Sequence, residues 1–127
     1  MIPFHGDYKP YEESGLTKIP MIYGWNLYAS WYFGTFKEFD TYIDEMHIRY
    51  PNKPTFITEY GADSDIRLHS LSPERFDYTQ EYSNLYHEHY LKAIKERPFI
   101  SAATVWNLNC FYSESRQNAI PHINGKG

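Results

Sequence analysis

Short apolar runs alternate along this chain with segments whose apolar residues recur at helical spacing. The apolar runs cover residues 19–25, 54–59 and 99–106. A run of this length between turn residues is typical of a buried strand, and parallel strands need a long crossover between them. The order strand, helix, strand, helix, strand over residues 19–127 therefore predicts an α/β fold with parallel strands.

The first helix is predicted to begin after Thr35, because Thr35 and Glu38 form the pattern of a capping box. Pro51 is predicted to end it, since a proline ring cannot continue the helical hydrogen bonds. Four residues at helical spacing are predicted to pack on the core: Phe39, Ile43, Met46 and Tyr50.

Ser72 and Pro73 predict the start of a second helix, because Ser is a favoured N-cap and Pro is favoured at the first helical position. The helix is expected to run to about Glu96, with Thr79 as an alternative start. Its buried side is predicted to consist of Tyr82, Leu85, Tyr86, His89, Tyr90, Ala93 and Ile94.

The two ends of the chain lack a regular pattern. Residues 1–18 are polar, and glycines and prolines interrupt any period, so this segment is predicted to be a loop. The tail, residues 117–127, has the same character and is also predicted to be a loop. The regular structure is therefore expected in residues 19–127.

The composition excludes several classes of function. The net charge is −4 and the 12 basic residues are scattered, so no nucleic-acid partner is expected. No apolar run approaches the roughly 18 residues of a membrane span, so no membrane partner is expected either. Cys110 is the only cysteine, which leaves no disulfide within the chain. The six histidines show no metal-ligand spacing, so neither a metal nor another cofactor is expected. The cellular compartment stays open.

Polar and aromatic residues follow each predicted strand: Asn26 and Tyr28, then Glu59, then Trp106 and Asn107. Barrel enzymes keep their catalytic residues at the carboxyl ends of parallel strands. A glutamate there can serve as a nucleophile or a general base. Aromatic residues make up 19% of the chain, and Tyr and Trp can stack on a sugar ring while hydrogen-bonding its hydroxyls. The alternatives are an acidic loop after a core strand and a core or interface rich in tyrosine.

Three stretches, in their order and spacing, resemble the catalytic barrel of glycoside hydrolase family 2, which contains β-galactosidases, β-glucuronidases and β-mannosidases. The stretches are Asn26-Leu27-Tyr28-Ala29-Ser30-Trp31-Tyr32, Thr58-Glu59-Tyr60-Gly61-Ala62 and Val105-Trp106-Asn107-Leu108-Asn109-Cys110-Phe111. The resemblance extends from about residue 19 to residue 127. It implies a partial (β/α)8 TIM barrel in which the predicted strands are about the sixth to the eighth.

The resemblance also implies roles for single residues, with Glu59 as the catalytic nucleophile. The substrate-binding residues that it implies are Asn26, Tyr28, Tyr32, Trp106, Asn107, Asn124 and Lys126. In glucuronidases an Asn-x-Lys pair, here Asn124 and Lys126, meets the sugar carboxylate, although other members carry a similar pair. Glucuronidases also tend to have an arginine just before this pair. Ile-Pro-His at residues 120–122 stands there instead, which favours a β-galactosidase.

Two residues depart from the family pattern. Cys110 stands where the resemblance implies Asp, and Ser30 stands where it implies Gly. Neither change removes the proposed nucleophile.

A retaining glycosidase needs a second carboxylate, about 5–5.5 Å from the nucleophile. In this family the second carboxylate is a Glu that follows an Asn, and the chain contains no Asn-Glu dipeptide. A whole barrel has about 250 residues, roughly twice this length. Residues 1–127 are therefore expected to be a C-terminal fragment of the catalytic domain of a retaining exo-β-glycosidase that hydrolyses terminal β-D-galactosides. The isolated fragment is expected to be inactive.

A partial barrel leaves open strand edges, so self-association of the chain is expected. A carbohydrate substrate is the expected partner of the full-length parent. One alternative is a β-glucuronidase or another glycosidase of the same family. A non-catalytic carbohydrate-binding or interaction domain is the other, which the strand–helix order disfavours because carbohydrate-binding modules are more often β-sandwiches.

Overall fold

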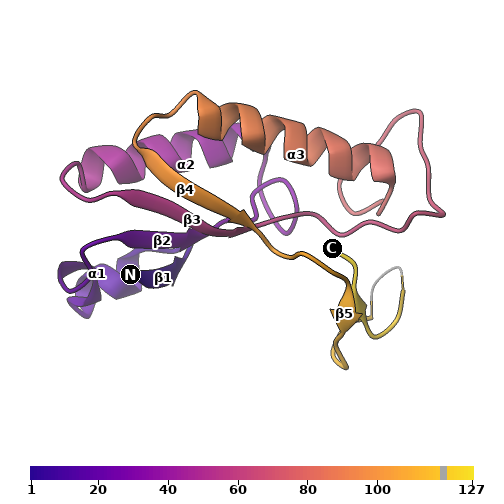
Figure 1. Cartoon of the computed structure of the whole chain (residues 1–127), viewed down its shortest axis with the longest axis horizontal. Helices are drawn as coiled ribbons and strands as arrows, with labels where there is room; N and C mark the ends of the chain where they lie inside the picture. The colour runs from indigo at the N-terminus through magenta and orange to yellow at the C-terminus, as the bar shows by residue number, and fades with distance from the viewer. Residues whose placement is uncertain (118–119) are drawn as a thin grey trace.

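A computed structural model of the chain describes residues 1–117 and 120–127. Its core is a four-stranded parallel sheet with strand order β1-β2-β3-β4, covered by the helices α2 and α3 (Figure 1). The elements in chain order are β1 (Ile2–His5), α1 (Lys9–Glu13), the 3-10 helix η1 (Leu16–Lys18), β2 (Tyr23–Asn26), α2 (Phe36–Arg49), β3 (Thr55–Tyr60), α3 (Gln80–Lys95), β4 (Ile100–Val105), β5 (Phe111–Tyr112) and β6 (Ile123–Asn124).

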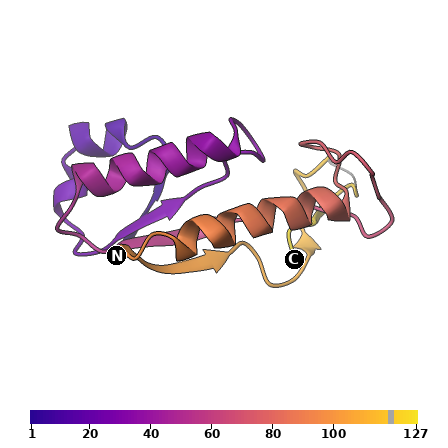
Figure 2. The ribbon, with the colours of Figure 1, turned by 90° about the horizontal axis from the view of Figure 1, so that it is seen from above.

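The predicted α/β fold is confirmed. β2, β3 and β4 are parallel neighbours, and α2 and α3 are the crossovers between them, as the alternation of runs predicts. Seen from above, both helices run over the strands (Figure 2). The arrangement brings the carboxyl ends of the parallel strands to one edge of the sheet, where polar residues can meet.

The prediction of a loop over residues 1–18 is wrong, because this segment contains β1, α1 and η1. Phe4 is fully buried and packs its ring against Tyr23 and Trp25, with ring centroids 5.7 and 5.4 Å apart. A four-residue strand gains its stability from the ladder with its neighbour, here β2, and from this packing. Neither contribution is visible in a local pattern.

Two predicted boundaries also shift. Ile19 and Met21 are exposed by 70% and 84%, and β2 begins only at Tyr23, which is where pairing with β3 begins. The predicted helix start at Ser72 is wrong. Residue Thr79, the alternative start, caps α3 instead, and its side chain accepts a hydrogen bond of 3.1 Å from the amide of Tyr82. Leu85, expected on the buried side, is 44% exposed.

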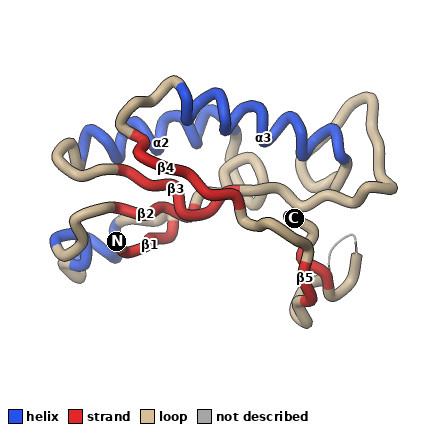
Figure 3. The backbone as a smooth tube through the Cα atoms, viewed as in Figure 1, coloured by secondary structure: helices blue, strands red, loops and turns tan. Residues whose placement is uncertain are grey.

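The C-terminal part of the chain contains a pair of short strands that its polar sequence does not predict. β5 and β6 pair antiparallel, apart from the four-stranded sheet (Figure 3). The prediction of a loop over residues 117–127 is therefore wrong at Ile123 and Asn124, because a two-residue strand is defined only by its partner. Residues 118 and 119 lie outside the described part of the chain.

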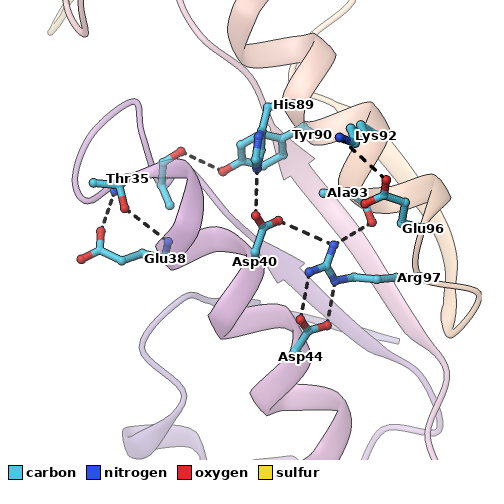
Figure 4. A network of polar contacts seen from close by, with 11 residues as sticks. Thr35, Glu38, Asp40, Asp44, His89, Tyr90, Lys92, Ala93, Glu96 and Arg97 are labelled. Atoms are coloured by element: carbon cyan, nitrogen blue, oxygen red, sulfur yellow. Dashed lines mark hydrogen bonds and ion pairs between the residues drawn. The ribbon is translucent and has the colours of Figure 1, made fainter.

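α2 follows its prediction closely. The Thr35 hydroxyl accepts from the Glu38 amide at 3.3 Å, and the Glu38 carboxylate accepts from the Thr35 amide at 2.5 Å, which completes the capping box (Figure 4). Phe39, Ile43 and Met46 are buried. The helix ends at Arg49, shortly before Pro51.

Tyrosine contributes much of the core, which agrees with the alternative interpretation that the high aromatic content reflects a core rich in tyrosine. Tyr90 stacks between Phe39 and Tyr60, with centroid distances of 3.9 and 5.2 Å. Among the described residues, the largest fully buried side chains are Phe4, Trp25, Trp31, Phe39, Ile43, Met46, Ile57, Tyr86 and Tyr90. Many of the aromatic residues therefore stabilise the fold and are not available to a sugar.

A polar network ties α2 to the end of α3 (Figure 4). The guanidinium of Arg97 forms a fork with Asp44, at 2.7 and 2.9 Å, and lies 3.6 Å from Asp40. His89 lies 3.2 Å from the other oxygen of Asp40. Hydrogen bonding to Arg97 lowers the pKa of Asp44 below its usual value.

Replacing Arg97 by Met is expected to lower the free energy of unfolding by about 1 kcal/mol at pH 7, since Asp44 is partly exposed and solvent screens the pair. Because the folded-state pKa of Asp44 is lowered, its contribution is present above the usual Asp pKa and fades as pH falls through the lowered value. Urea unfolding at pH 7 and pH 3 tests this. Lys92→Met, which removes an exposed pair with Glu96 at 4.0 Å, should change nothing measurable. Equal losses in both variants would contradict the assignment.

Among the described residues, no helix is both long and apolar enough to cross a bilayer. Within the four-stranded sheet, β1 and β4 are the edge strands. The expected self-association rests on these edges and stays a prediction.

Candidate active site

Glu59 lies near the carboxyl end of β3 and is partly exposed. The Tyr28 hydroxyl donates a hydrogen bond of 2.8 Å to Glu59 Oε2. Burial, and next the neighbouring carboxylate, raise the pKa of Tyr28 well above its usual range. Tyr28 therefore stays protonated and holds one carboxylate oxygen, which leaves the other oxygen for chemistry.

Asn26 is the register partner of Glu59 across β2 and β3. The pairing shifts next to both residues, and such irregularities re-aim side chains at strand ends. The Thr58 hydroxyl donates to Asn26 Oδ1 at 2.6 Å, which fixes the amide beside the glutamate. The predicted proximity of Asn26, Tyr28 and Glu59 is thus what the structure has.

A cationic cluster, formed by Lys126 and Arg116 around Asp63, lies near the Tyr28 ring. The ammonium of Lys126 is 5.6 Å from the Tyr28 ring centroid and 4.7 Å from that of Tyr32. It contacts the buried carboxylate of Asp63. Burial lowers the pKa of Lys126 to about 8, although Asp63 acts in the opposite direction. The predicted residue Lys126 therefore sits one aromatic ring away from Glu59.

Asn124 is buried and serves the local backbone, since its side chain accepts from the Lys126 amide at 3.2 Å. The side chain of Lys126 is also fully buried. The Asn-x-Lys pair is therefore a covered part of the site, and not its exposed wall.

Arg116 is a site residue that the sequence did not indicate. Its guanidinium donates to the Tyr32 hydroxyl at 2.8 Å and lies 3.6 Å from Asp63. Its side chain is 21% exposed, unlike that of Lys126. Arg116 lies between β5 and β6, and the pairing of these strands brings it to the cluster. The sequence could have indicated this fold-back only through the pairing of β5 with β6. Each of these strands has two residues, so the sequence pattern that predicts them is weak.

Trp106 and Asn107 follow β4. The Trp106 amide donates to the Tyr60 carbonyl at 2.8 Å, which keeps this loop beside the end of β3. The Trp106 ring is 38% exposed and packs edge-on against Phe111. The peptide bond between Trp106 and Asn107 is cis. The Asn107 amide binds the Asn109 carbonyl within its own loop.

Residues 25–125 match the family described as glycosyl hydrolase catalytic core. The chain belongs to this family.

Three relatives are similar to this chain over most of its length. Two structures of Bacteroides uniformis β-glucuronidase, one covalently bound to cyclophellitol-6-carboxylate aziridine, are 45% identical with a TM-score of 0.94, and the match covers 98% of this chain. A β-glucuronidase of Bacteroides fragilis is 32% identical over 122 residues, or 91% of this chain. The structure of a candidate β-galactosidase from Bacteroides fragilis is 26% identical over 84% of this chain, with a TM-score of 0.76.

The chain spans only part of these relatives: 15% of the Bacteroides uniformis chain, 18% of the curated Bacteroides fragilis β-glucuronidase and 17% of the candidate β-galactosidase. The predicted partial TIM barrel is confirmed, since these neighbours are TIM-barrel glycosidases and the open parallel sheet matches one part of them.

The two departures from the family pattern have structural consequences. Ser30 adopts a left-handed φ of 65°, a conformation that Gly adopts without cost, and its hydroxyl lies 3.0 Å from that of Tyr82. Cys110 Sγ donates to the Gly127 carbonyl at 3.0 Å. Gly61 is required by space, because a Cβ atom there would lie 2.4 Å from the Trp106 carbonyl oxygen.

The two carboxylates described at this site, those of Glu59 and Asp63, differ in exposure. Glu59 is partly exposed, whereas Asp63 is buried and bound by Lys126 and Trp31. Asp63 is therefore unsuited to move a proton to a leaving group. Among residues 1–117 and 120–127, no group of three His, Cys, Asp or Glu side chains could hold a metal ion.

Proposed function

We propose that this chain supplies the nucleophile and part of the sugar subsite of a retaining β-glycosidase of glycoside hydrolase family 2 that hydrolyses β-glucuronides. One observation carries the proposal: Tyr28 touches both the carboxylate of Glu59, through its hydroxyl, and the cationic cluster of Lys126, through its ring. A sugar placed over this ring would have its anomeric carbon at the carboxylate and its far end near the cations.

In the proposed mechanism, Glu59 attacks the anomeric carbon while the bond from that carbon to the aglycone oxygen breaks, and the general acid protonates the departing oxygen. Water then hydrolyses the covalent glycosyl-enzyme, which releases the sugar and regenerates the carboxylate of Glu59. Tyr28 holds Oε2 and so orients the carboxylate for attack by Oε1. The general acid, about 5–5.5 Å from the nucleophile in retaining enzymes, would come from outside residues 1–127. Asn26 would meet a sugar hydroxyl beside the reacting carbon.

The charges of the cluster favour an acidic sugar. Lys126 and Arg116 are cations, Asp63 is the carboxylate between them, and so one positive charge is left over. Arg116 is the accessible cation, and a guanidinium has five donors, of which the Tyr32 contact uses one. The β-glucuronidase names of the relatives and the carboxylate-bearing inhibitor bound to one of them support the same choice.

Hydrolysis of β-D-galactosides is the second candidate. Its support is the Ile-Pro-His sequence at residues 120–122 and the candidate β-galactosidase among the relatives. Arg116 weakens the first support, because an arginine reaches the cluster from another position in the sequence. The galactoside specificity expected from the sequence stays a prediction.

A chimera tests the choice between the two sugars. Residues 1–127 replace the matching segment of the Bacteroides uniformis enzyme, to which 98% of the chain aligns at 45% identity. Hydrolysis of 4-nitrophenyl β-D-glucuronide at least tenfold faster than of the β-D-galactoside would support the proposal. The reverse preference would favour the second candidate, and a folded chimera without activity on either would contradict both.

A further inference from the structure

Asp63 is buried, 3% exposed, and lies just beyond β3, four residues after Glu59. It faces two cations and two neutral N–H groups. We propose that Asp63 is a positioning residue, which fixes the place of Lys126 and keeps its buried ammonium charged within the cationic cluster of Lys126 and Arg116. The proposal rests on the proposed function of this cluster.

The geometry around Asp63 joins three segments of the chain. Its Oδ2 accepts a 3.0 Å hydrogen bond from the Trp31 indole and contacts the Lys126 ammonium. Its Oδ1 accepts a 3.0 Å bond from the Gly125 amide, and the next residue, Ser64, donates its amide to the Gly125 carbonyl at 2.9 Å. The loop after β2, the loop after β3 and the segment after β6 therefore meet at one carboxylate.

The carboxylate also keeps Lys126 charged. A buried ammonium without a partner deprotonates, because burial disfavours the charged form. Burial by the rings of Tyr28, Trp31 and Tyr32 acts in this direction on Lys126. Arg116 also lowers the pKa of Lys126, and Asp63 is the neighbour that raises it.

The remaining neighbours cannot replace Asp63 as a counterion. Tyr28 and Tyr32 have raised pKa values and stay neutral near pH 7. His87, whose pKa is lowered by burial and by Lys126, is neutral or positive. Glu59 accepts the hydrogen bond of the Tyr28 hydroxyl. Without Asp63, Lys126 is therefore expected to lose its proton near neutral pH.

The test follows the titration of Lys126 by NMR, from its side-chain ε-carbon resonance, in the whole chain and in Asp63→Asn. The Lys126 pKa is expected to fall by at least about one unit in the variant. Asp65→Asn is the matched control, because Asp65 is equally buried but pairs with Arg67, and it should leave the titration unchanged. An unmoved Lys126 titration in Asp63→Asn would overturn the proposal.

Two additions keep the test decisive. If Asp63→Asn fails to fold, the double variant Asp63→Asn/Lys126→Met is expected to fold, because it removes the unpaired cation together with its counterion. Failure of both variants to fold would contradict the proposal.

Calorimetry with D-glucuronate separates the role of Asp63 from the proposed function. If the unmodified chain does not bind D-glucuronate, this counts against the proposed function alone. If it binds, affinity at pH 7.5 should fall about threefold in Asp63→Asn for a one-unit shift, because the charged fraction of Lys126 falls from about three quarters to about one quarter.

Discussion

Replacement of Glu59 by glutamine should lower the turnover of 4-nitrophenyl β-D-glucuronide by the chimera on the order of 10⁴-fold or more, because loss of a nucleophile removes the covalent route. Glutamine keeps the size of the side chain and an acceptor for the Tyr28 hydroxyl, so the fold should be unchanged. Initial rates and a circular dichroism melting curve measure the two effects separately.

Two variants serve as controls for this result. Tyr28→Phe removes the hydrogen bond to Glu59 but keeps the ring, and it should cost about 10- to 100-fold, as expected for one bond to a charged group. Glu88→Gln, on the exposed side of α3, should have no effect. Glu59→Gln activity within tenfold of the unmodified chimera would remove Glu59 from the mechanism.

Arg116→Gln should reduce kcat/KM for the β-glucuronide by about 10- to 150-fold, which corresponds to the loss of a hydrogen bond between charged groups. The loss should appear mainly in KM, because the sugar carboxylate lies far from the reacting carbon. Arg116 can be changed without exposing the buried pair, since Lys126 still contacts Asp63.

The change should be selective. Activity on the β-galactoside should stay within about threefold, because this sugar has no carboxylate for the Arg116 guanidinium to bind. Arg75→Gln, which removes another exposed arginine that donates to the Gly34 carbonyl, is the matched control. An equal loss on both sugars would show that Arg116 serves the fold and not the choice of substrate.

Long periodic elements could be predicted from the sequence. α2 has a capping box, a core-facing stripe and a proline stop, and all three are local features. β3 could be predicted from its apolar run. It places Glu59 near the carboxyl end of the strand, where barrel enzymes have their catalytic residues. β1, β5 and β6 could not be predicted, because their few residues are strands only through their partners.

The residues of the site likewise fall into those that the sequence could predict and those that it could not. Asn26, Tyr28 and Glu59 follow adjacent parallel strands, so their proximity follows from the strand order alone. Arg116 reaches the site through the fold-back of the tail, which also brings Lys126 to Asp63 and depends on contacts between distant residues. The burial of Lys126 could not be predicted either, since the rings of Tyr28 and Tyr32 near its ammonium come from a distant part of the sequence.

The sequence also left open a function without catalysis, that of a carbohydrate-binding or interaction domain. Family membership and the partly exposed Glu59 with its tyrosine donor favour an enzyme. A binding domain would gain nothing from a carboxylate held with one oxygen free. Self-association through the edges of β1 and β4 is compatible with either and can be read from light scattering of the purified chain.

The most direct measurement is covalent labelling of the chimera with 2-deoxy-2-fluoro-β-D-glucuronyl fluoride, followed by intact-mass analysis and peptide mapping. Its fluoride leaving group departs without a general acid, so the experiment isolates the nucleophile. We expect the mass of one 2-fluoroglucuronyl group on the peptide that contains Glu59, and none in Glu59→Gln. A label on another residue, or labelling that survives Glu59→Gln, would contradict the central claim.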